Sequence, residues 1–169
     1  MENIRRNKGF INGIVYWMFN DCWPASSGWS FVDYCCLPKA SFYSFRRCSQ
    51  KIICSIEKKE SYDIYVCNDD TSSKTVNYKL YYLFDGQFTD ICTDSAYIDA
   101  HISKKVTTIP KNNIPENAVI FCDIECNGFT DRAFYKQGNL FIKPTNAVKI
   151  TQKTENSVTV YARQTMLTP

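Results

Sequence analysis

One short stretch, residues 16–24 (Tyr-Trp-Met-Phe-Asn-Asp-Cys-Trp-Pro), constrains the fold more than any other part of the sequence. The run that leads into it, residues 13–16, is almost wholly apolar and is typical of a strand buried on both faces. Asn20 and Asp21 end that run, because short side chains that bond to nearby backbone favour turns. A buried strand that stops in Asn, Asp and Trp is typical of the mouth of a parallel barrel, where ligands bind.

The rest of the N-terminal part predicts one more structural unit. Residues 1–12 read as the tail of a helix and a loop, and residues 29–34 as a second short extended run. Pro38 opens a helix over residues 38–49, since proline is favoured at the first helical position. One strand, a loop and one helix cannot enclose a core. We therefore predict that residues 1–49 are the last strand–loop–helix unit of a larger (β/α)8 barrel.

After residue 50 the pattern changes from helix to strand. Short β-rich runs alternate with turn clusters, and Asn127-Gly128 is a signal for a type I′ hairpin. Runs without intervening helices predict an immunoglobulin-like antiparallel β-sandwich over residues 50–145, so the chain is mainly β. Residues 146–169 predict the start of a further β domain or added edge strands. The expected strands are residues 52–56, 62–67, 76–84, 101–109, 118–126, 131–135, 147–151 and 157–162.

Charge and hydropathy exclude two classes of partner. The net charge is +3, with 20 basic and 17 acidic residues spread along the chain. This balance gives no electrostatic footprint for nucleic acid or for a membrane surface. No apolar run approaches the roughly 20 residues that a membrane span requires.

Cysteine usage predicts a cytoplasmic protein without a metal or cofactor. The nine cysteines are an odd number, no C-x-x-C pair occurs, and His101 is the single histidine. The start of the chain is charged and lacks the apolar core of a secretory signal. Several cysteines lie inside strand-like runs, where a reduced thiol behaves as a small hydrophobic side chain. His101 reads as a surface strand residue.

The N-terminal motifs together resemble a known family. Residues 17–24 (Trp-Met-Phe-Asn-Asp-Cys-Trp-Pro) and 29–34, then Pro38-Lys39-Ala40, Tyr43 and Arg46-Arg47, follow one another in the order found at the end of the catalytic barrel of glycoside hydrolase family 2. The β-mannosidase branch is the most similar. Residues 62–70 resemble the sandwich that follows the barrel in that family, and residues 140–150 resemble the entry to its last sandwich.

The sequence also departs from the family pattern. Met18-Phe19 stands where Gln-Leu is usual, an extra residue precedes Trp29, and Cys35-Cys36-Leu37 replaces Tyr-Gly-Arg. Methionine after the first tryptophan also occurs in the exo-β-glucosaminidase branch. The sugar therefore stays open among a mannoside, a glucosaminide and a glucuronide.

The resemblance implies that this chain is the non-catalytic, C-terminal portion of a retaining exo-β-glycosidase. Such enzymes need two carboxylates about 5 Å apart, and in the family both are glutamates on earlier barrel strands. Neither lies here, so we expect no catalytic residue and no hydrolysis by the chain alone. The implied partners are an oligosaccharide or glycoside substrate and the upstream barrel on which the chain packs.

Three residues are predicted to bind substrate: Trp17, Asn20 and Asp21. The Trp17 indole can offer a flat apolar face to a pyranose, and the alternative is that it is simply a core residue. Asp21 either orients the rim loop or a sugar hydroxyl, or only caps a turn. Trp23 and Trp29 are expected to serve packing.

A second hypothesis is a stand-alone β-sandwich module that binds carbohydrate or protein. It requires a row of exposed aromatic side chains on one face of the sandwich. Tyr78, Tyr81, Tyr82 and Phe84 could supply such a row, but their spacing is mixed and most of them are expected in the core.

Overall fold

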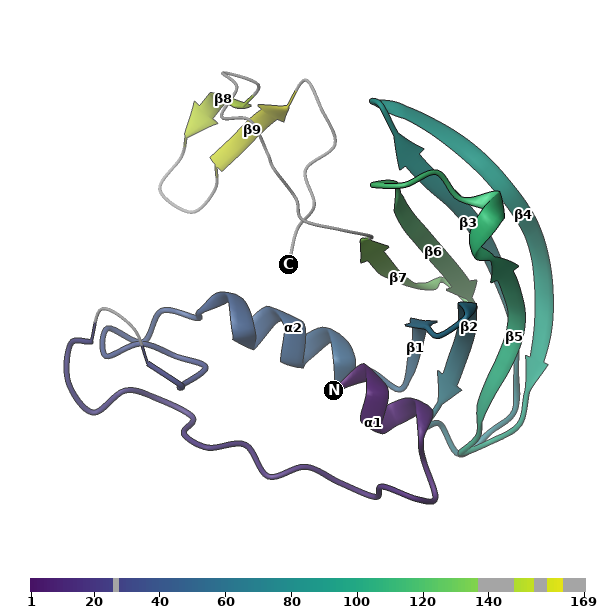
Figure 1. Cartoon of the computed structure of the whole chain (residues 1–169). Coiled ribbons are helices and arrows are strands. Elements are labelled where there is room, and N and C mark those ends of the chain that lie inside the picture. The colour runs from purple at the N-terminus through teal and green to yellow at the C-terminus, as the bar shows by residue number, and fades with distance from the viewer. Residues whose placement is uncertain (26–27, 137–147, 154–157, 163–169) are drawn as a thin grey trace.

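The computed structural model describes residues 1–25, 28–136, 148–153 and 158–162 (Figure 1). They form a β-sandwich with two α-helices at one end of it and a further two-stranded sheet. The longest helix of these ranges has nine residues, and none is long and apolar enough to cross a membrane. Residues 140–147, part of the stretch that resembles the entry to a last sandwich, lie outside the described residues.

Two antiparallel sheets build the sandwich. In the first sheet the strand order is β1-β2-β5, and in the second it is β4-β3-β6-β7. A third sheet pairs β8 with β9, and a short 3₁₀ helix, η1, precedes β6. The strands and this helix are β1 (Ile52–Lys58), β2 (Ser61–Asn68), β3 (Lys74–Phe84), β4 (Gln87–Ile98), β5 (Ser103–Pro110), η1 (Lys111–Asn113), β6 (Val119–Cys126), β7 (Phe129–Lys136), β8 (Val148–Lys153) and β9 (Val158–Ala162).

The strand order confirms the predicted immunoglobulin-like sandwich. In the constant-type arrangement the fourth strand pairs with the fifth, whereas here β4 pairs with β3 in the opposite sheet. The sequence analysis missed β4, and it wrongly included His101 in a strand. His101 lies in the turn before β5 and adopts a left-handed backbone conformation with φ of 58°.

Alternating side chains explain why β3 packs as it does. Val76, Tyr78 and Leu80 are buried, and the intervening Asn77 and Lys79 are exposed. This period of two places one face of the strand in the core between the sheets. Burial of each large apolar side chain stabilises the fold by about 1.5–3 kcal/mol. The fully buried residues from the two sheets include Ile53, Ile64, Val66, Val76, Leu80, Ile98 and Ile120.

The hairpin predicted at Asn127-Gly128 is confirmed. Its φ angles are 50° and 79°, which are the two positive values of a type I′ turn. Asp85-Gly86 repeats the same geometry between β3 and β4, with φ angles of 47° and 75°.

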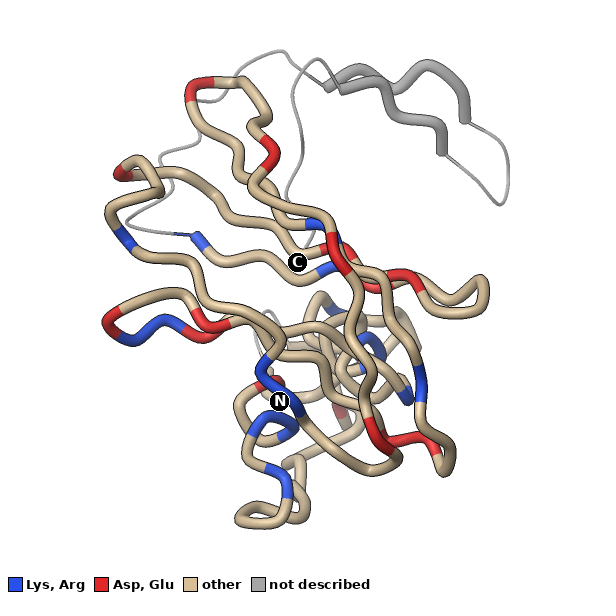
Figure 2. The backbone as a smooth tube through the Cα atoms, turned by 90° about the vertical axis from the view of Figure 1, so that its right-hand side faces the viewer, with Lys and Arg blue, Asp and Glu red and all other residues tan. Residues whose placement is uncertain are grey.

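The N-terminal part contains α1 (Glu2–Arg6) and α2 (Ala40–Cys48). The predicted helix over residues 38–49 is therefore confirmed, but the strand predicted at residues 13–16 does not form. These residues run along the N-terminal loop that extends away from the sandwich in Figure 1. A strand needs a neighbour to bond its backbone groups, and no neighbour is available among the described residues. In Figure 2 basic and acidic residues are interspersed along the chain.

Candidate functional site

The loop that carries the predicted site is anchored to α2 by aromatic rings. Phe31 is buried, and its ring stacks on Tyr16 with a centroid distance of 3.7 Å. Phe31 also meets Phe45 of α2 at 4.6 Å, and Tyr16 meets the same Phe45 ring at 6.2 Å. The backbone N–H groups of Phe31 and Val32 both donate to the carbonyl of Phe19, at 3.0 and 2.9 Å. These contacts close the loop so that residues 19–21 and 31–32 lie side by side.

Asp21 is the buried centre of this loop. Its carboxylate accepts a hydrogen bond from the Ser30 hydroxyl at 2.6 Å and one from the Lys39 ammonium at 2.6 Å. Lys39 also donates to Ser30 Oγ at 2.8 Å, so the three side chains form a closed triangle. The hydrogen bond from Lys39, and then that from Ser30, lowers the pKa of Asp21, and burial opposes this only in part. The carboxylate is therefore ionised, and each of its two oxygens accepts a hydrogen bond from a protein side chain.

Gly28 leaves the space that this triangle needs. A Cβ atom at position 28 would lie 2.7 Å from Asp21 Oδ1 and 3.1 Å from Lys39 Nζ. Both distances are tighter than ordinary van der Waals contact. A larger residue would therefore push the carboxylate away from its two donors.

The three predicted site residues are placed differently. Asn20 is exposed, and its amide donates to the Asp21 carbonyl at 3.2 Å. Trp17 projects into solvent with 71% of its surface exposed, so it is not a core residue of this chain. Asp21 has only 7% of its surface exposed, which fits a residue that orients the loop better than one that contacts a sugar directly. Met18, which follows Trp17, has a φ of 76° and so lies in the left-handed region of backbone conformation.

Large apolar side chains are exposed all along the loop. Trp23 and Trp29, expected to serve packing, have 67% and 76% of their surface exposed, so the described residues provide no packing for them. Extended apolar exposure is typical of interaction surfaces. We call it the aromatic surface, and its members are Phe10, Val15, Trp17, Phe19, Trp23, Trp29, Tyr34 and Leu37.

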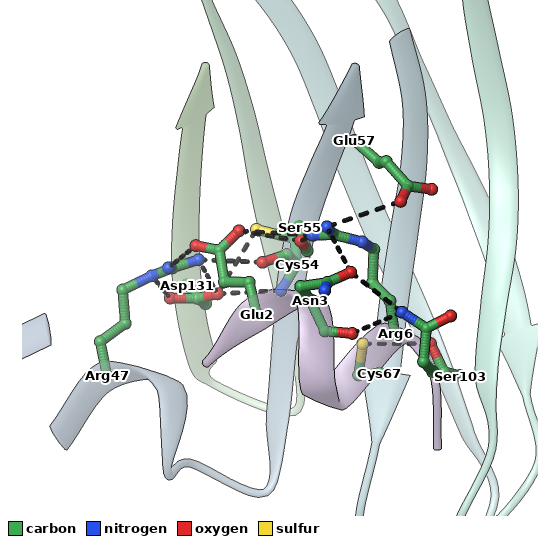
Figure 3. A network of polar contacts seen from close by, with 11 residues as sticks. Glu2, Asn3, Arg6, Arg47, Cys54, Ser55, Glu57, Cys67, Ser103 and Asp131 are labelled. Atoms are coloured by element: carbon green, nitrogen blue, oxygen red, sulfur yellow. Dashed lines mark hydrogen bonds and ion pairs between the residues drawn. The ribbon is translucent and has the colours of Figure 1, made fainter. Parts of the chain in front are cut away.

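A polar junction joins α1 and α2 to the sandwich (Figure 3). Arg47 of α2 makes a two-pronged pair with Asp131 of β7, from Nε to Oδ1 at 2.8 Å and from Nη2 to Oδ2 at 3.0 Å. Asp131 also accepts from the backbone N–H of Cys54 at 2.9 Å. Glu2 of α1 accepts from Arg47 at 2.5 Å and from Ser55 at 2.8 Å. Burial opposes the charge on Arg47, but the bonds and charge of Asp131 outweigh it and raise the pKa of the guanidinium.

Arg5 completes the junction by capping the end of α2. Its guanidinium donates to the carbonyls of Cys48, Gln50 and Lys51 at 2.6, 2.7 and 3.1 Å, and it pairs with Asp69 at 3.0 Å. Helix C-termini expose carbonyls without intrahelical partners, and a cation is favoured there by the helix dipole. Neither arginine contact could be predicted from the sequence, because Arg47 lies 84 residues from Asp131 and Arg5 lies 43–46 residues from the carbonyls that it caps.

An open groove of about 920 Å³ lies between α2 and the β3–β6–β7 part of the second sheet. Its lining includes Arg47 with Asp131, and Arg132 with Asp123, so its principal charges are already paired. Within the described ranges, no three His, Cys, Asp or Glu side chains gather as metal ligands would. All nine cysteines lie in those ranges as free thiols.

In comparisons with known proteins, this chain is similar in part to fungal β-mannosidases. No family model matches the sequence. Over 108 residues it is 29% identical to β-mannosidase B of Emericella nidulans, and over 69 residues 36% identical to β-mannosidase B of Aspergillus flavus. These alignments cover 58% and 41% of this chain but only 12% and 8% of the fungal proteins.

Two solved structures share the fold. The β-D-mannosidase of Dictyoglomus thermophilum superposes with a TM-score of 0.71 at 23% identity, over 80% of this chain and 17% of the other. The exo-chitosanase of Amycolatopsis orientalis superposes with a TM-score of 0.64 at 19% identity, over 89% of this chain and 18% of the other. The chain thus spans less than a fifth of the length of each of these four relatives.

Proposed function

Since this chain is similar to the C-terminal region of the β-mannosidases of glycoside hydrolase family 2, we propose that it is the non-catalytic, C-terminal portion of a retaining exo-β-glycosidase. The whole enzyme would hydrolyse terminal β-linked sugars. In this proposal residues 1–49 complete a catalytic barrel, residues 50–145 are a scaffolding sandwich, and residues 146–169 begin a further β part.

The aromatic surface is the observation that carries this proposal. A single loop that exposes Trp17, Trp23 and Trp29 cannot be stable on hydrophobic burial of its own. The remaining strands and helices of a barrel would cover such a surface. Residues 13–16 pair with no strand of the described part of the chain, which supports the same proposal, because a neighbouring barrel strand would bond their backbone.

Within that barrel the predicted site would form one wall of the sugar subsite. Trp17 would present its indole face to the C–H face of a pyranose, and the exposed Asn20 amide would hydrogen-bond to a hydroxyl. Asp21 would hold both in place through the triangle with Ser30 and Lys39. The polar junction of Arg47 and Asp131 supports the scaffolding role, since it fixes α2 to the sandwich. The free thiols support a cytoplasmic location.

A chimera tests the proposal. The matching stretch of the Emericella nidulans enzyme is replaced by that of this chain, and turnover of 4-nitrophenyl β-mannoside, β-glucosaminide and β-glucuronide is measured. We expect hydrolysis by the chimera, fastest for the mannoside, and none by the isolated chain. Replacing Trp17 by alanine should lower kcat/KM about tenfold, which corresponds to about 1.4 kcal/mol of lost transition-state stabilisation.

Trp23→Ala is the matched control, because that indole is similarly exposed and is assigned to packing. Its kcat/KM should change much less. A folded chimera that hydrolyses none of the three glycosides would refute the glycosidase assignment. Equal effects of the two tryptophan changes would refute the subsite wall, and turnover by the isolated chain would refute its non-catalytic role.

A further inference from the structure

The outer face of the second sheet carries aromatic side chains outside the core. Tyr81 of β3 lies directly across from Phe121 of β6, and Phe121 lies across from Phe134 of β7. Their sequence neighbours Leu80, Ile120 and Ala133 point into the core, so these three rings point away from it. Phe88 of β4 joins them, and we call Tyr81, Phe88, Phe121 and Phe134 the outer aromatic cluster.

The four rings form one connected layer. Phe121 is the base, with 2% of its surface exposed, and Tyr81 stacks on it at 5.1 Å with an interplanar angle of 13°. Phe88 meets Tyr81 at 5.7 Å and Phe121 at 6.2 Å, while Phe134 meets Phe121 at 6.4 Å. Phe88 and Phe134 keep 52% and 41% of their surface exposed. The layer therefore has a rigid base and two exposed apolar rings.

Charged side chains border the layer as matched pairs. Arg132 bonds to Asp123 through two hydrogen bonds of 2.6 and 2.8 Å, and its guanidinium lies 6.0 Å from the Phe121 ring. Tyr81 donates its hydroxyl to Asp123 at 3.1 Å. Burial, and then the charge of Asp123, raises the pKa of Tyr81 to about 12, so the phenol keeps its proton at neutral pH.

A second ion pair completes the border. Lys79 lies 2.8 Å from Asp90 and 5.8 Å from the centre of the Tyr81 ring. The border thus holds two cations and two anions, and its net charge is zero. A neutral border attracts neither nucleic acid nor an anionic membrane. It does offer donors and acceptors at fixed positions, which is complementary to a neutral ligand rich in hydroxyl groups.

We propose that the outer aromatic cluster is a binding site for a neutral oligosaccharide. Two sugar units pack their C–H faces, one on Phe88 and one on Phe134, while their hydroxyls hydrogen-bond to the donor and acceptor positions that the ion pairs of Arg132, Asp123 and Lys79 leave open. The residues of the site all lie on sandwich strands, and Lys79, Asp123, Arg132 and Phe134 also line the groove beside α2. The site uses none of Trp17, Asn20 and Asp21. It is therefore an accessory sugar site, separate from the subsite wall of the proposed function.

The test measures binding of β-1,4-linked mannotetraose to the full chain by calorimetry and by NMR titration. We expect saturable binding in the millimolar range or tighter, and about tenfold weaker binding in Phe88→Ala and Phe134→Ala. Phe88→Leu and Phe134→Leu remove the ring but keep the apolar bulk. They should weaken binding to a similar extent, which separates loss of the ring from loss of the fold.

Tyr97→Ala is the matched control, because Tyr97 is 57% exposed on the same sheet but pairs with Thr75 at the far end of β3. Its affinity should equal that of the unchanged chain. The inference fails if no saturable binding occurs, if Tyr97→Ala weakens binding as much as Phe88→Ala, or if only Trp17→Ala abolishes it. It also fails if sedimentation shows a dimer that Phe88→Ala dissociates, since the cluster would then be an interface between two copies.

Discussion

Replacing Arg47 by alanine should destabilise the chain far more than replacing Arg132, the neighbour of Asp131 on β7, by alanine. Arg47 supplies two of the hydrogen bonds to the Asp131 carboxylate, and the Asp131 side chain is only 3% exposed. After the change, the backbone N–H of Cys54 is the principal donor left to that carboxylate. A buried charge that loses its partner is costly because water cannot replace the missing bonds.

The expected cost follows from the exposure of the two side chains. Breaking a buried ion pair by removing one partner costs about 3–5 kcal/mol. Arg47 itself is 26% exposed, so we expect a value at the lower end, about 3 kcal/mol. Arg132 and Asp123 form an equally two-pronged pair, but their side chains are 58% and 33% exposed. Arg132→Ala should therefore cost at most about 1 kcal/mol.

Urea unfolding and thermal melts of Arg47→Ala and Arg132→Ala measure the two losses of stability. For a chain of this size, the expected losses correspond to a fall in Tm of about 6–12 °C for Arg47→Ala and no more than about 4 °C for Arg132→Ala. The double variant Arg47→Ala with Asp131→Asn should recover part of the loss, because the buried charge is then gone. Equal costs for the two single variants would refute the reasoning that burial, and not pairing geometry, sets the energy.

Three further outcomes are expected. Gly28→Ala should lower the free energy of unfolding of the N-terminal loop by about 1–3 kcal/mol, because the new methyl group meets Asp21. The control Gly13→Ala should not lower it, because the space around Gly13 is open. The lowered pKa of Asp21 stabilises the loop above the ordinary value of 3.8, and this contribution disappears as the pH falls through the lowered value. All three tryptophans lie in the loop, so their fluorescence should report an acid transition that Asp21→Asn removes. Gly128→Ala should cost about 1 kcal/mol in thermal melts, since φ at this position is 79°.

The sandwich could be predicted because its information is local. Alternating burial and the Asn127-Gly128 turn each depend on residues close together in the sequence. The strand β4 was not predicted, because its own residues lack this local signal. It is an edge strand whose first four residues are all exposed, so it lacks the apolar alternation that identifies a strand.

The site could be predicted only in part, because its partners are distant in the sequence. Asp21 stands out as a turn residue, but Lys39 follows it by 18 positions and contacts it only when the loop closes. Arg46-Arg47 stood out as part of the family motif and gave no sign of Asp131. The strand expected at residues 13–16 does not form, for a different reason. Apolar residues favour a strand only where another strand is present to pair with it.

Helix α2 connects the two parts of the chain, and this has a consequence for the candidate site. Phe45 packs on Phe31, which closes the loop that holds Asp21, and two residues later Arg47 fixes the same helix to the sandwich. The loop has few contacts of its own, so its position depends on α2. Loosening α2 at Arg47 should therefore change the tryptophan fluorescence of the loop, although no tryptophan lies in the sandwich. Arg132→Ala should leave that fluorescence unchanged, because the Arg132 pair lies wholly within the second sheet.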